Sequence, residues 1–269
     1  MTDEAFRKLV MGHWHKHGRR DLPWRKSINP YRVLVSEIML QQTQVARVVE
    51  KYKEFLRAFP TFRILASAST ADVLKVWQGL GYNRRALALH RCAKVVVQMH
   101  GGKLPSDSAS LQTLPGIGPY TAGAVIAFAL DRPVAMIETN IRRVYLHHYF
   151  PRRRKVADTT LLPIIARHVA QVGSAREWYS ALMDYGAHLA TLVKNPNRRS
   201  KHYTRQSHFE GSVRQLRGKI LTYLAETGLV RKENLAASMA DARTQDVVIA
   251  LEREGFLHVH KQHWLRLMR

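Results

Sequence analysis

LPGIGPYTAGA, residues 114–124, is the segment from which the architecture of this chain is predicted most directly. Gly116 and Gly118 indicate a tight turn, and an alanine- and glycine-rich helix follows from Pro119, where proline suits the first helical position. Backbone N–H groups at such a turn and helix start face outward and can bind a phosphate. Because many helix–helix turns contain glycine and proline, the segment by itself indicates a helical hairpin and leaves its anion-binding role open.

Hydrophobic residues recur with a helical period on both sides of this hairpin, so the chain is predicted to be mainly α. Helix start signals support the assignment, for example Ser69 before Thr70 and Ser174 before Ala175. The segments with this period are 31–58, 70–78, 84–99, 119–130, 140–150, 158–172 and 175–193.

The pattern changes after residues 1–193, which we assign to one main domain. Residues 194–211 are polar, basic and without periodicity, so we expect a linker there. Residues 212–269 are similar to a winged-helix module, whose third helix would enter a DNA groove. The alternative is a helical cap with a β tail that packs on the main domain. The helices of this module are expected at 212–226, 232–239 and 242–254, and a β-hairpin at 256–267.

The charge of the chain predicts a polyanionic partner. It carries 43 Lys and Arg residues against 20 Asp and Glu, a net charge of +23. The charge clusters in residues 132–155 and 194–219, where aromatic residues are interleaved, and this favours a surface that tracks a nucleic-acid backbone. An anionic membrane surface is the alternative, but no strongly hydrophobic helix face lies beside the charge.

Composition also bounds the location and the cofactors. No apolar run approaches the ~20 residues of a membrane span, and the N-terminus lacks a signal-peptide core, so we expect a cytoplasmic, nucleoid-associated protein. Cys92 is the single cysteine, which excludes an internal disulfide and any four-cysteine iron–sulfur or metal site. The 14 histidines are scattered without the spacing of metal ligands. We therefore expect no cofactor and no metal bound by side chains.

A glutamate lies in the most apolar part of the predicted helix at 31–58. Glu37 is flanked by apolar residues 33–35 and 38–40, and burial there would raise its pKa until it holds a proton near neutral pH, as a general acid requires. The alternative is that Glu37 lies on a polar stripe of the helix. That stripe would comprise Arg32, Ser36, Gln41 and Gln44.

A second carboxylate, Glu138, follows the apolar run 133–137 at the predicted start of a helix. The helix dipole and Arg142, four residues on, are expected to keep Glu138 ionised; ordinary helix capping is the alternative. One carboxyl group that stays protonated and one that stays charged are the pair needed to cleave a glycosidic bond through an oxocarbenium-like state. On DNA, that bond would be the N-glycosidic link between base and sugar.

Five short motifs occur along the chain in the order Leu22–Arg25, Ser36–Val45, Gly79–Tyr82, Leu114–Ala124 and Asn140–Val144. In this order they resemble the helix-hairpin-helix superfamily of DNA glycosylases, and most closely the adenine glycosylases of the MutY type, which act on adenine opposite 8-oxoguanine or G. The resemblance covers about residues 4–190. It implies a fold of two helical lobes and a monomeric enzyme that flips a base out of mismatched or damaged double-stranded DNA.

The resemblance implies catalytic roles at single positions. Glu37 matches the general acid that protonates the departing adenine. Glu138 stands where the family has the aspartate that stabilises the sugar cation, and Asn140 matches an asparagine that supports it. Tyr120 occupies the position of the Schiff-base lysine of bifunctional relatives, so strand cleavage by β-elimination is not expected. Tyrosine also occurs there in thymine-mismatch relatives, so this position leaves the excised base open.

The resemblance also implies residues that contact DNA. Gln42 and Tyr82 match residues that wedge into the base stack, and Thr43 matches one near the opposite base. Gly116 and Gly118 match the phosphate-binding hairpin, which in relatives can also hold a monovalent cation through backbone carbonyls. The other contacts to DNA or to the flipped base are expected from Trp24, Arg25, Gln41, Arg142, Arg143, Arg198, Arg199 and Lys201.

Three departures from the family pattern bear on function. Glu138 replaces an aspartate, and its extra methylene moves the carboxylate by roughly 1 Å unless the backbone compensates. The cysteines of the family's 4Fe–4S cluster are absent, so the basic loop at 194–205 has to be held by packing. The 8-oxoguanine-reading C-terminal domain is also missing. We expect a monofunctional, clusterless adenine glycosylase; the alternatives are a glycosylase for thymine, uracil or another damaged base, and a non-catalytic DNA-binding relative.

Overall fold

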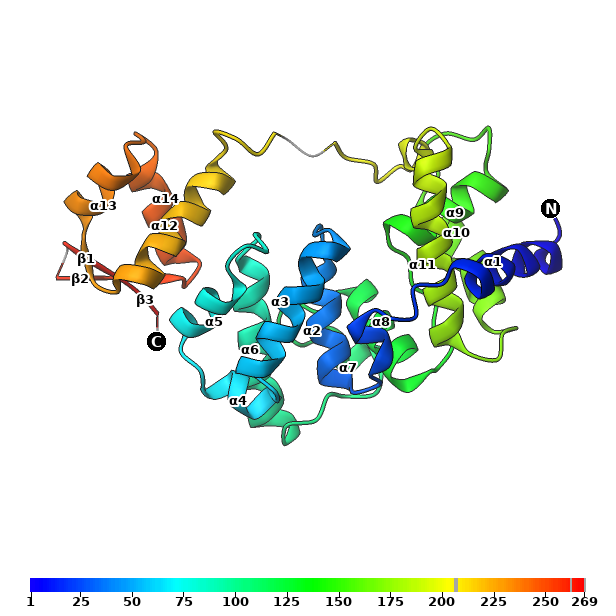
Figure 1. The fold of residues 1–269 in the computed structure, drawn as a ribbon, viewed down its shortest axis with the longest axis horizontal. Coiled ribbons are helices and arrows are strands. Elements are labelled where there is room, and N and C mark those ends of the chain that lie inside the picture. The colour runs from blue at the N-terminus through cyan, green and yellow to red at the C-terminus, as the bar shows by residue number, and fades with distance from the viewer. Residues whose placement is uncertain (206–207, 262, 269) are drawn as a thin grey trace. The chain divides into compact units, whose positions relative to one another are not determined.

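The computed structural model describes residues 1–205, 208–261 and 263–268, and these residues are mainly helical, as predicted (Figure 1). The chain divides into two compact units. Unit 1 comprises residues 1–37, 105–113 and 117–205, and unit 2 comprises residues 38–104, 114–116 and 206–269. No helix in the described residues combines the length and the apolarity needed to span a membrane.

Unit 1 is built around an aromatic core. Helix α11 packs against α9 and α1, and the fully buried rings of Phe6, Tyr145 and Trp178 meet where these helices cross. The ring centroids of Phe6 and Tyr145 are 5.2 Å apart in a tilted arrangement, which is favourable for aromatic pairs. The elements of unit 1 are α1 (Asp3–His17), η1 (Pro23–Lys26), most of α2 (Pro30–Leu40), α7 (Ser108–Gln112), α8 (Pro119–Leu130), α9 (Thr139–Tyr149), α10 (Asp158–Val169), α11 (Ala175–Leu192) and η2 (Pro196–Arg199).

Unit 2 joins the remaining helices of the main fold to the C-terminal segment. Helix α4 packs on α6, and α5 packs on α3, α6 and α12. Its elements are α3 (Val45–Ala58), α4 (Phe62–Ser67), α5 (Thr70–Trp77), α6 (Arg84–His100), α12 (Val213–Thr227), β1 (Val230–Arg231), α13 (Lys232–Met239), α14 (Thr244–Arg253), β2 (Leu257–His260) and β3 (Trp264–Leu267).

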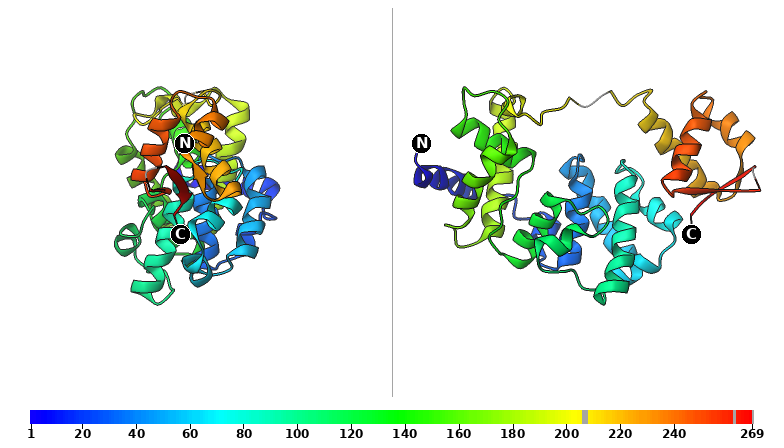
Figure 2. Two further views of the ribbon diagram at one scale, coloured as in Figure 1. Left: turned by 90° about the vertical axis from the view of Figure 1, so that its left-hand side faces the viewer. Right: turned by 180° about the vertical axis from the view of Figure 1, so that it is seen from behind.

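The C-terminal segment contains the three helices and the hairpin that its sequence predicts. The hairpin β2–β3 is antiparallel, with Val259 opposite Leu265, and β1 adds on the far side of β3 to give the order β1-β3-β2. Strand β2 packs against α14 and strand β3 against α12; both strands are red in Figures 1 and 2. Helices and strands thus follow one another in the order of a winged-helix module.

Contacts within unit 2 support the alternative role of this segment, a cap that packs on the main fold. Helix α12 lies on α5, and Glu254 at the end of α14 pairs with Arg84 of α6 at 2.5 Å and with Arg217 of α12 at 2.5 Å. The exposed residues of α14 include Asp246 and Arg253, so its exposed face has no excess of positive charge. Such a face is poorly suited to a groove lined by phosphates.

Two predicted boundaries differ from the structure. The helix expected over 31–58 breaks at residues 41–44, where Gln42 adopts a left-handed backbone conformation with a φ of 53°. The segment 194–211, expected to lack regular structure, contains the short helix η2, and Ser200 forms a parallel β-bridge with Val156. The break separates Glu37 on α2 from the polar residues that follow it, and the bridge fixes the basic loop.

Candidate active site

Glu37 lies in the last turns of α2 and is 5% exposed, so the polar-stripe alternative is wrong. The neighbouring Ser36 is buried too, and its hydroxyl turns back to donate to the carbonyl of Val33 at 2.8 Å. Burial raises the pKa of Glu37 to about 7, because a desolvated carboxylate is costly. A carboxyl group with this pKa is half protonated at neutral pH and can donate a proton.

Tyr120, the second residue of α8, holds Glu37 in place. Its hydroxyl donates a 2.6 Å hydrogen bond to Oε2 of Glu37. Burial and the neighbouring carboxylates raise the pKa of Tyr120 well above its usual value, so the hydroxyl keeps its proton. The hydrogen bond favours the ionised form of Glu37 and lowers its pKa, whereas the charge of Glu138 raises it. Burial outweighs the hydrogen bond, and Glu37 keeps its raised pKa.

Glu138 is the N-cap of α9. Its Oε1 accepts from the backbone N–H groups of Asn140 at 2.7 Å and Ile141 at 2.8 Å, and its Oε2 accepts from the side-chain amide of Asn140 at 3.3 Å. Burial raises the pKa of Glu138, although these N–H groups and two arginines oppose the rise. The helix start and Arg142 were expected to keep Glu138 ionised, and they do lower its pKa, but burial acts against them.

The two arginines of α9 are engaged inside unit 1. Arg142 forms a bidentate ion pair with Asp158, at 2.7 and 2.6 Å. Arg143 donates to Oδ1 of Asn140 at 2.6 Å and to the carbonyl of Gly186 at 2.7 Å. By holding the amide oxygen, Arg143 turns the amide N–H₂ of Asn140 toward Glu138. Contact of either arginine with DNA stays a prediction.

Gly186 is required by the close approach of α11 to α9. A Cβ atom at this position would lie 2.5 Å from the carbonyl oxygen of Asn140. No local pattern predicts this contact, since Gly186 lies in the middle of a regular helix. The absence of a side chain at Gly186 therefore allows the Glu138–Asn140 turn to pack directly against α11.

Arg25 of η1 is fixed by a residue that sequence reasoning missed. Its guanidinium donates to both carboxylate oxygens of Asp184, at 2.7 and 2.9 Å, and Arg19 binds the same carboxylate. Burial of Asp184 raises its pKa, but the two arginines outweigh burial and lower it. The charge of Arg25 reaches Glu37 and lowers its pKa. Trp24, the other predicted pocket residue on η1, is 9% exposed.

In unit 2, one arginine brings together the two predicted wedge segments. The guanidinium of Arg85 donates to carbonyls at the end of α2, to Oγ1 of Thr43 at 3.0 Å, and to the carbonyls of Leu80 and Gly81 at 3.1 Å. Arg85 also donates to the carbonyl of Gln41, the first residue after α2. Gln42 and Tyr82 both have left-handed backbones, with φ of 53° and 48°. Arg85 thus fixes two strained turns whose side chains are the predicted wedges.

The glycines of the hairpin are exposed, as a phosphate-binding turn requires. Gly116 has a φ of +78°, and a Cβ atom there would lie 2.7 Å from Cβ of Ala88, so no other residue fits without movement. Gly118 is the N-cap of α8, and no side chain caps the start of this helix. Binding of a phosphate or a monovalent cation here stays a prediction. Among the described residues, no group of three His, Cys, Asp or Glu side chains could hold a metal ion.

Comparisons with known proteins identify the family of the chain. The family of HhH-GPD superfamily base excision DNA repair proteins matches residues 35–163. The chain is 37% identical to an adenine DNA glycosylase of Mycobacterium tuberculosis, over 90% of this chain and 92% of that protein. It is 36% identical to the adenine DNA glycosylase of Mycolicibacterium smegmatis, over 80% of this chain and 78% of that protein.

Solved structures agree as well. A thermostable thymine-DNA glycosylase is similar with a TM-score of 0.61 and 27% identity, over 69% of this chain and 86% of that one. A non-covalent Endonuclease III–DNA complex matches at a TM-score of 0.54 and 18% identity, over 69% of this chain and 84% of that chain, and so shares the fold. The chain belongs to the HhH-GPD superfamily of base excision DNA repair proteins. It is a DNA glycosylase, and its partner is DNA.

Proposed function

We propose that this glycosylase releases adenine from duplex DNA in which the adenine lies opposite 8-oxoguanine or G, and that it leaves the strand uncut. The buried Glu37 carries the proposal, since its pKa of about 7 and its hydrogen bond to Tyr120 make it a positioned proton donor. Adenine as the base is supported by the relatives named above, which are adenine glycosylases over most of the chain length.

The first chemical step is the departure of the base. Glu37 donates its proton to a ring nitrogen of the flipped adenine, and the bond between C1′ and the base nitrogen breaks. The electron pair of that bond leaves with the base, which departs neutral, and the sugar is left as an oxocarbenium cation. Proton transfer from a positioned acid contributes typically 10²- to 10⁴-fold to such a step.

The second step is the capture of the cation by water. The carboxylate of Glu138, held by two backbone N–H groups and by the amide of Asn140, stabilises the positive charge on the sugar. Water then forms a bond to C1′, and its proton passes to a carboxylate, which leaves an abasic site. Arg143 acts through Asn140 and is a positioning residue.

Strand cleavage needs an amine that forms a Schiff base with C1′, and the position that would carry it holds Tyr120, whose hydroxyl is bound to Glu37. The 4Fe–4S cluster of the resembling glycosylases does not fit this chain. Cys92 is its single thiol, lies buried in α6 and has a pKa raised by burial to about 12. We therefore propose a monomer that works on mismatched DNA without a cluster.

Thymine opposite G is the second candidate substrate, because the thymine-DNA glycosylase is 27% identical to this chain. A single-turnover panel separates the two. Duplexes that carry adenine, thymine, uracil or hypoxanthine opposite each base are incubated with excess enzyme, and strand breaks are counted with and without alkali. Release of adenine, visible only after alkali, supports the proposal. Preferential release of thymine or uracil would show that the enzyme excises pyrimidines instead. Strand breaks without alkali would show lyase activity.

A further inference from the structure

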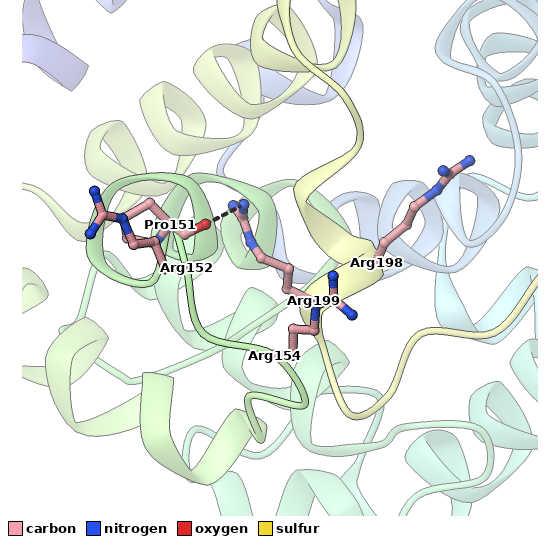
Figure 3. Close-up of a pocket in the computed structure, with 5 residues that line it drawn as sticks. All are labelled: Pro151, Arg152, Arg154, Arg198 and Arg199. Atoms are coloured by element: carbon pink, nitrogen blue, oxygen red, sulfur yellow. Dashed lines mark hydrogen bonds between the residues drawn. The ribbon is translucent and has the colours of Figure 1, made fainter.

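The arginines around the basic loop of unit 1 do not converge on one group. They line a pocket of about 500 Å³, formed by Pro151, Arg152, Arg154, Arg198 and Arg199. Arg199 donates to the carbonyl of Pro151 at 2.9 Å, and the side chains of Arg152 and Arg198 point away from each other (Figure 3). Contact of Arg198, Arg199 and Lys201 with DNA stays a prediction.

In unit 2, by contrast, two arginines converge on Tyr82, one of the predicted wedge residues. The backbone of Tyr82 is left-handed, which is uncommon for a large residue, and Arg85 fixes this turn through the carbonyls of Leu80 and Gly81. At the far end of the ring, the guanidinium of Arg214 donates a 2.8 Å hydrogen bond to the Tyr82 hydroxyl. The guanidinium groups of Arg85 and Arg214 lie 5.4 and 5.7 Å from the ring centroid. The protein itself thus fixes the orientation of the ring.

Arg214 belongs to the C-terminal segment and is the second residue of α12. The helix dipole opposes a cation in the first turn of a helix, and the first turn of α12 contains no acidic residue that would compensate it. Side chains of a helix lean toward its N-terminus, so Arg214 can extend past the start of α12 to Tyr82. The stability of α12 therefore does not account for an arginine at this position, whereas the contact with Tyr82 does.

Helix α12 is a firm base for Arg214, because it packs on α5 and is tied to α14. Arg217, one turn after Arg214, donates to both carboxylate oxygens of Glu254, at 3.0 and 2.5 Å. Arg91 of α6 donates to the backbone carbonyl of Glu254 at 2.8 Å. On its other side, the guanidinium of Arg214 lies 5.9 Å from the ring centroid of Phe209, which precedes α12. A chain of contacts thus connects α6, α14 and α12 to the predicted wedge.

We propose that Arg214 is a positioning residue, which acts through the Tyr82 hydroxyl to fix the orientation in which the ring enters the base stack. A side chain that is already ordered loses less conformational entropy on binding, so the ring inserts more readily when Arg214 holds it. The C-terminal segment thereby takes part in opening the duplex, although its own helices need not enter a groove. The proposal rests on the DNA glycosylase function and on the wedge role predicted for Tyr82.

The test measures unstacking of the duplex by the fluorescence of 2-aminopurine, which rises when this base loses its stacking neighbours. The probe is placed in turn at each position beside the mismatch, and a fluorine at C2′ of the target nucleotide keeps the glycosidic bond intact. With the wild type, fluorescence rises at a position beside the mismatch, and Y82A removes this rise. No rise with the wild type, or a full rise with Y82A, would overturn the proposal.

Two variants remove the hydrogen bond and keep the ring in place: R214M removes the donor, and Y82F removes the acceptor. Each should lower the fluorescence rise at the same position and slow single-turnover base release from the unmodified duplex by roughly five- to tenfold. A full rise in R214M would overturn the proposal. A loss in R214M that Y82F does not share would also overturn it, because the defect would then come from undocking of α12.

A double-mutant cycle tests whether Arg214 acts through the Tyr82 hydroxyl. If it does, R214M/Y82F should release the base no more than about twofold more slowly than the slower of the two single variants. Effects that multiply in the double variant would show that Arg214 acts independently of Tyr82, which would overturn the proposal.

R253Q is the matched control for charge. Arg253 is an exposed residue at the end of α14 in the same C-terminal segment, and we expect R253Q to keep the full fluorescence rise. Loss of the rise in R253Q would indicate general attraction by the charge of the segment and would overturn a role specific to Arg214. The fluorescence does not depend on which base is released. A wild type that spares adenine and releases thymine would refute the proposed substrate, and the same variants on a duplex with thymine opposite G would still decide the role of Arg214.

Discussion

Replacement of Tyr120 by phenylalanine should shift the pH dependence of base release to higher pH. The Tyr120 hydroxyl donates at 2.6 Å to Glu37, and this bond lowers the pKa of a carboxyl that burial raises to about 7. Without the hydroxyl, burial and the charge of Glu138 still raise the pKa of Glu37, and the hydrogen bond that lowers it is lost. Glu37 is the acid, so it is active while protonated. A higher pKa therefore extends activity upward in pH.

The size of the shift follows from the strength of the bond. A hydrogen bond to an ionised carboxylate is worth roughly 1 to 1.5 kcal/mol more than one to the protonated group. At about 1.4 kcal/mol per pKa unit, loss of the bond raises the pKa of Glu37 by about one unit, to about 8. Between pH 6 and 8.5 the protonated fraction then falls about fourfold in Y120F, against about 30-fold in the wild type.

The assay is single-turnover adenine release with saturating enzyme at pH values from 6 to 8.5. The shape of the profile is the readout, because Tyr120 also contributes to the absolute rate if it touches the base. Y179F is the control: Tyr179 is another buried tyrosine of unit 1, and its hydroxyl donates to the carbonyl of Val134, away from Glu37. It should keep the wild-type profile. A Y120F profile that matches the wild type, or shifts to lower pH, would refute the reasoning.

Three further predictions concern other parts of the structure. E138D, which restores the residue expected of the family, should lower the single-turnover rate of base release by up to ~10²-fold. The shorter side chain withdraws its carboxylate from the two N–H groups that hold Glu138. A rate at or above that of the wild type would show that the backbone adjusts freely. R85K should destabilise the protein to urea by about 2 kcal/mol, since three ammonium protons cannot satisfy the acceptors now bound by Arg85, and a loss below about 0.5 kcal/mol would contradict the role given to it. Arg84 and Arg217 lower the pKa of Glu254 to about 2, so its stabilising contribution is present above its unfolded pKa of about 4.5 and is lost as pH falls toward 2. E254Q should therefore have a lower melting temperature than the wild type at pH 7, and the difference should shrink near pH 3. A difference that stays constant with pH would argue against the ion pairs.

The parts of this molecule that were predictable are those with a local cause. The hairpin and the start of α8 follow from Gly116, Gly118 and Pro119, and α8 begins and ends where the hydrophobic period does. The burial of Glu37 follows from the apolar residues on both sides of it. The C-terminal helices and the hairpin were likewise predictable within a few residues, because alternation and helical period change there at clear turn signals.

What could not be predicted depends on contacts between distant segments. Asp184 is 159 residues from Arg25, and the sequence around neither residue predicts their ion pair. The break after Leu40 is stabilised by Arg85, more than 40 residues away. The effect of burial on Glu138 has the same origin: its helix start was visible in the sequence, but the packing that desolvates it and raises its pKa was not.

The most direct test of the central claim is base release by E37Q, a variant that keeps the size of the side chain and removes its acidic proton. Release of adenine from duplexes with A opposite 8-oxoguanine and A opposite G is measured under single-turnover conditions, and binding to the same duplexes is measured separately. If Glu37 is the proton donor, release falls by roughly 10²- to 10⁴-fold while the Kd changes by no more than a few fold. Release at the wild-type rate would contradict the account, because Glu37 could then not be the acid that protonates the base.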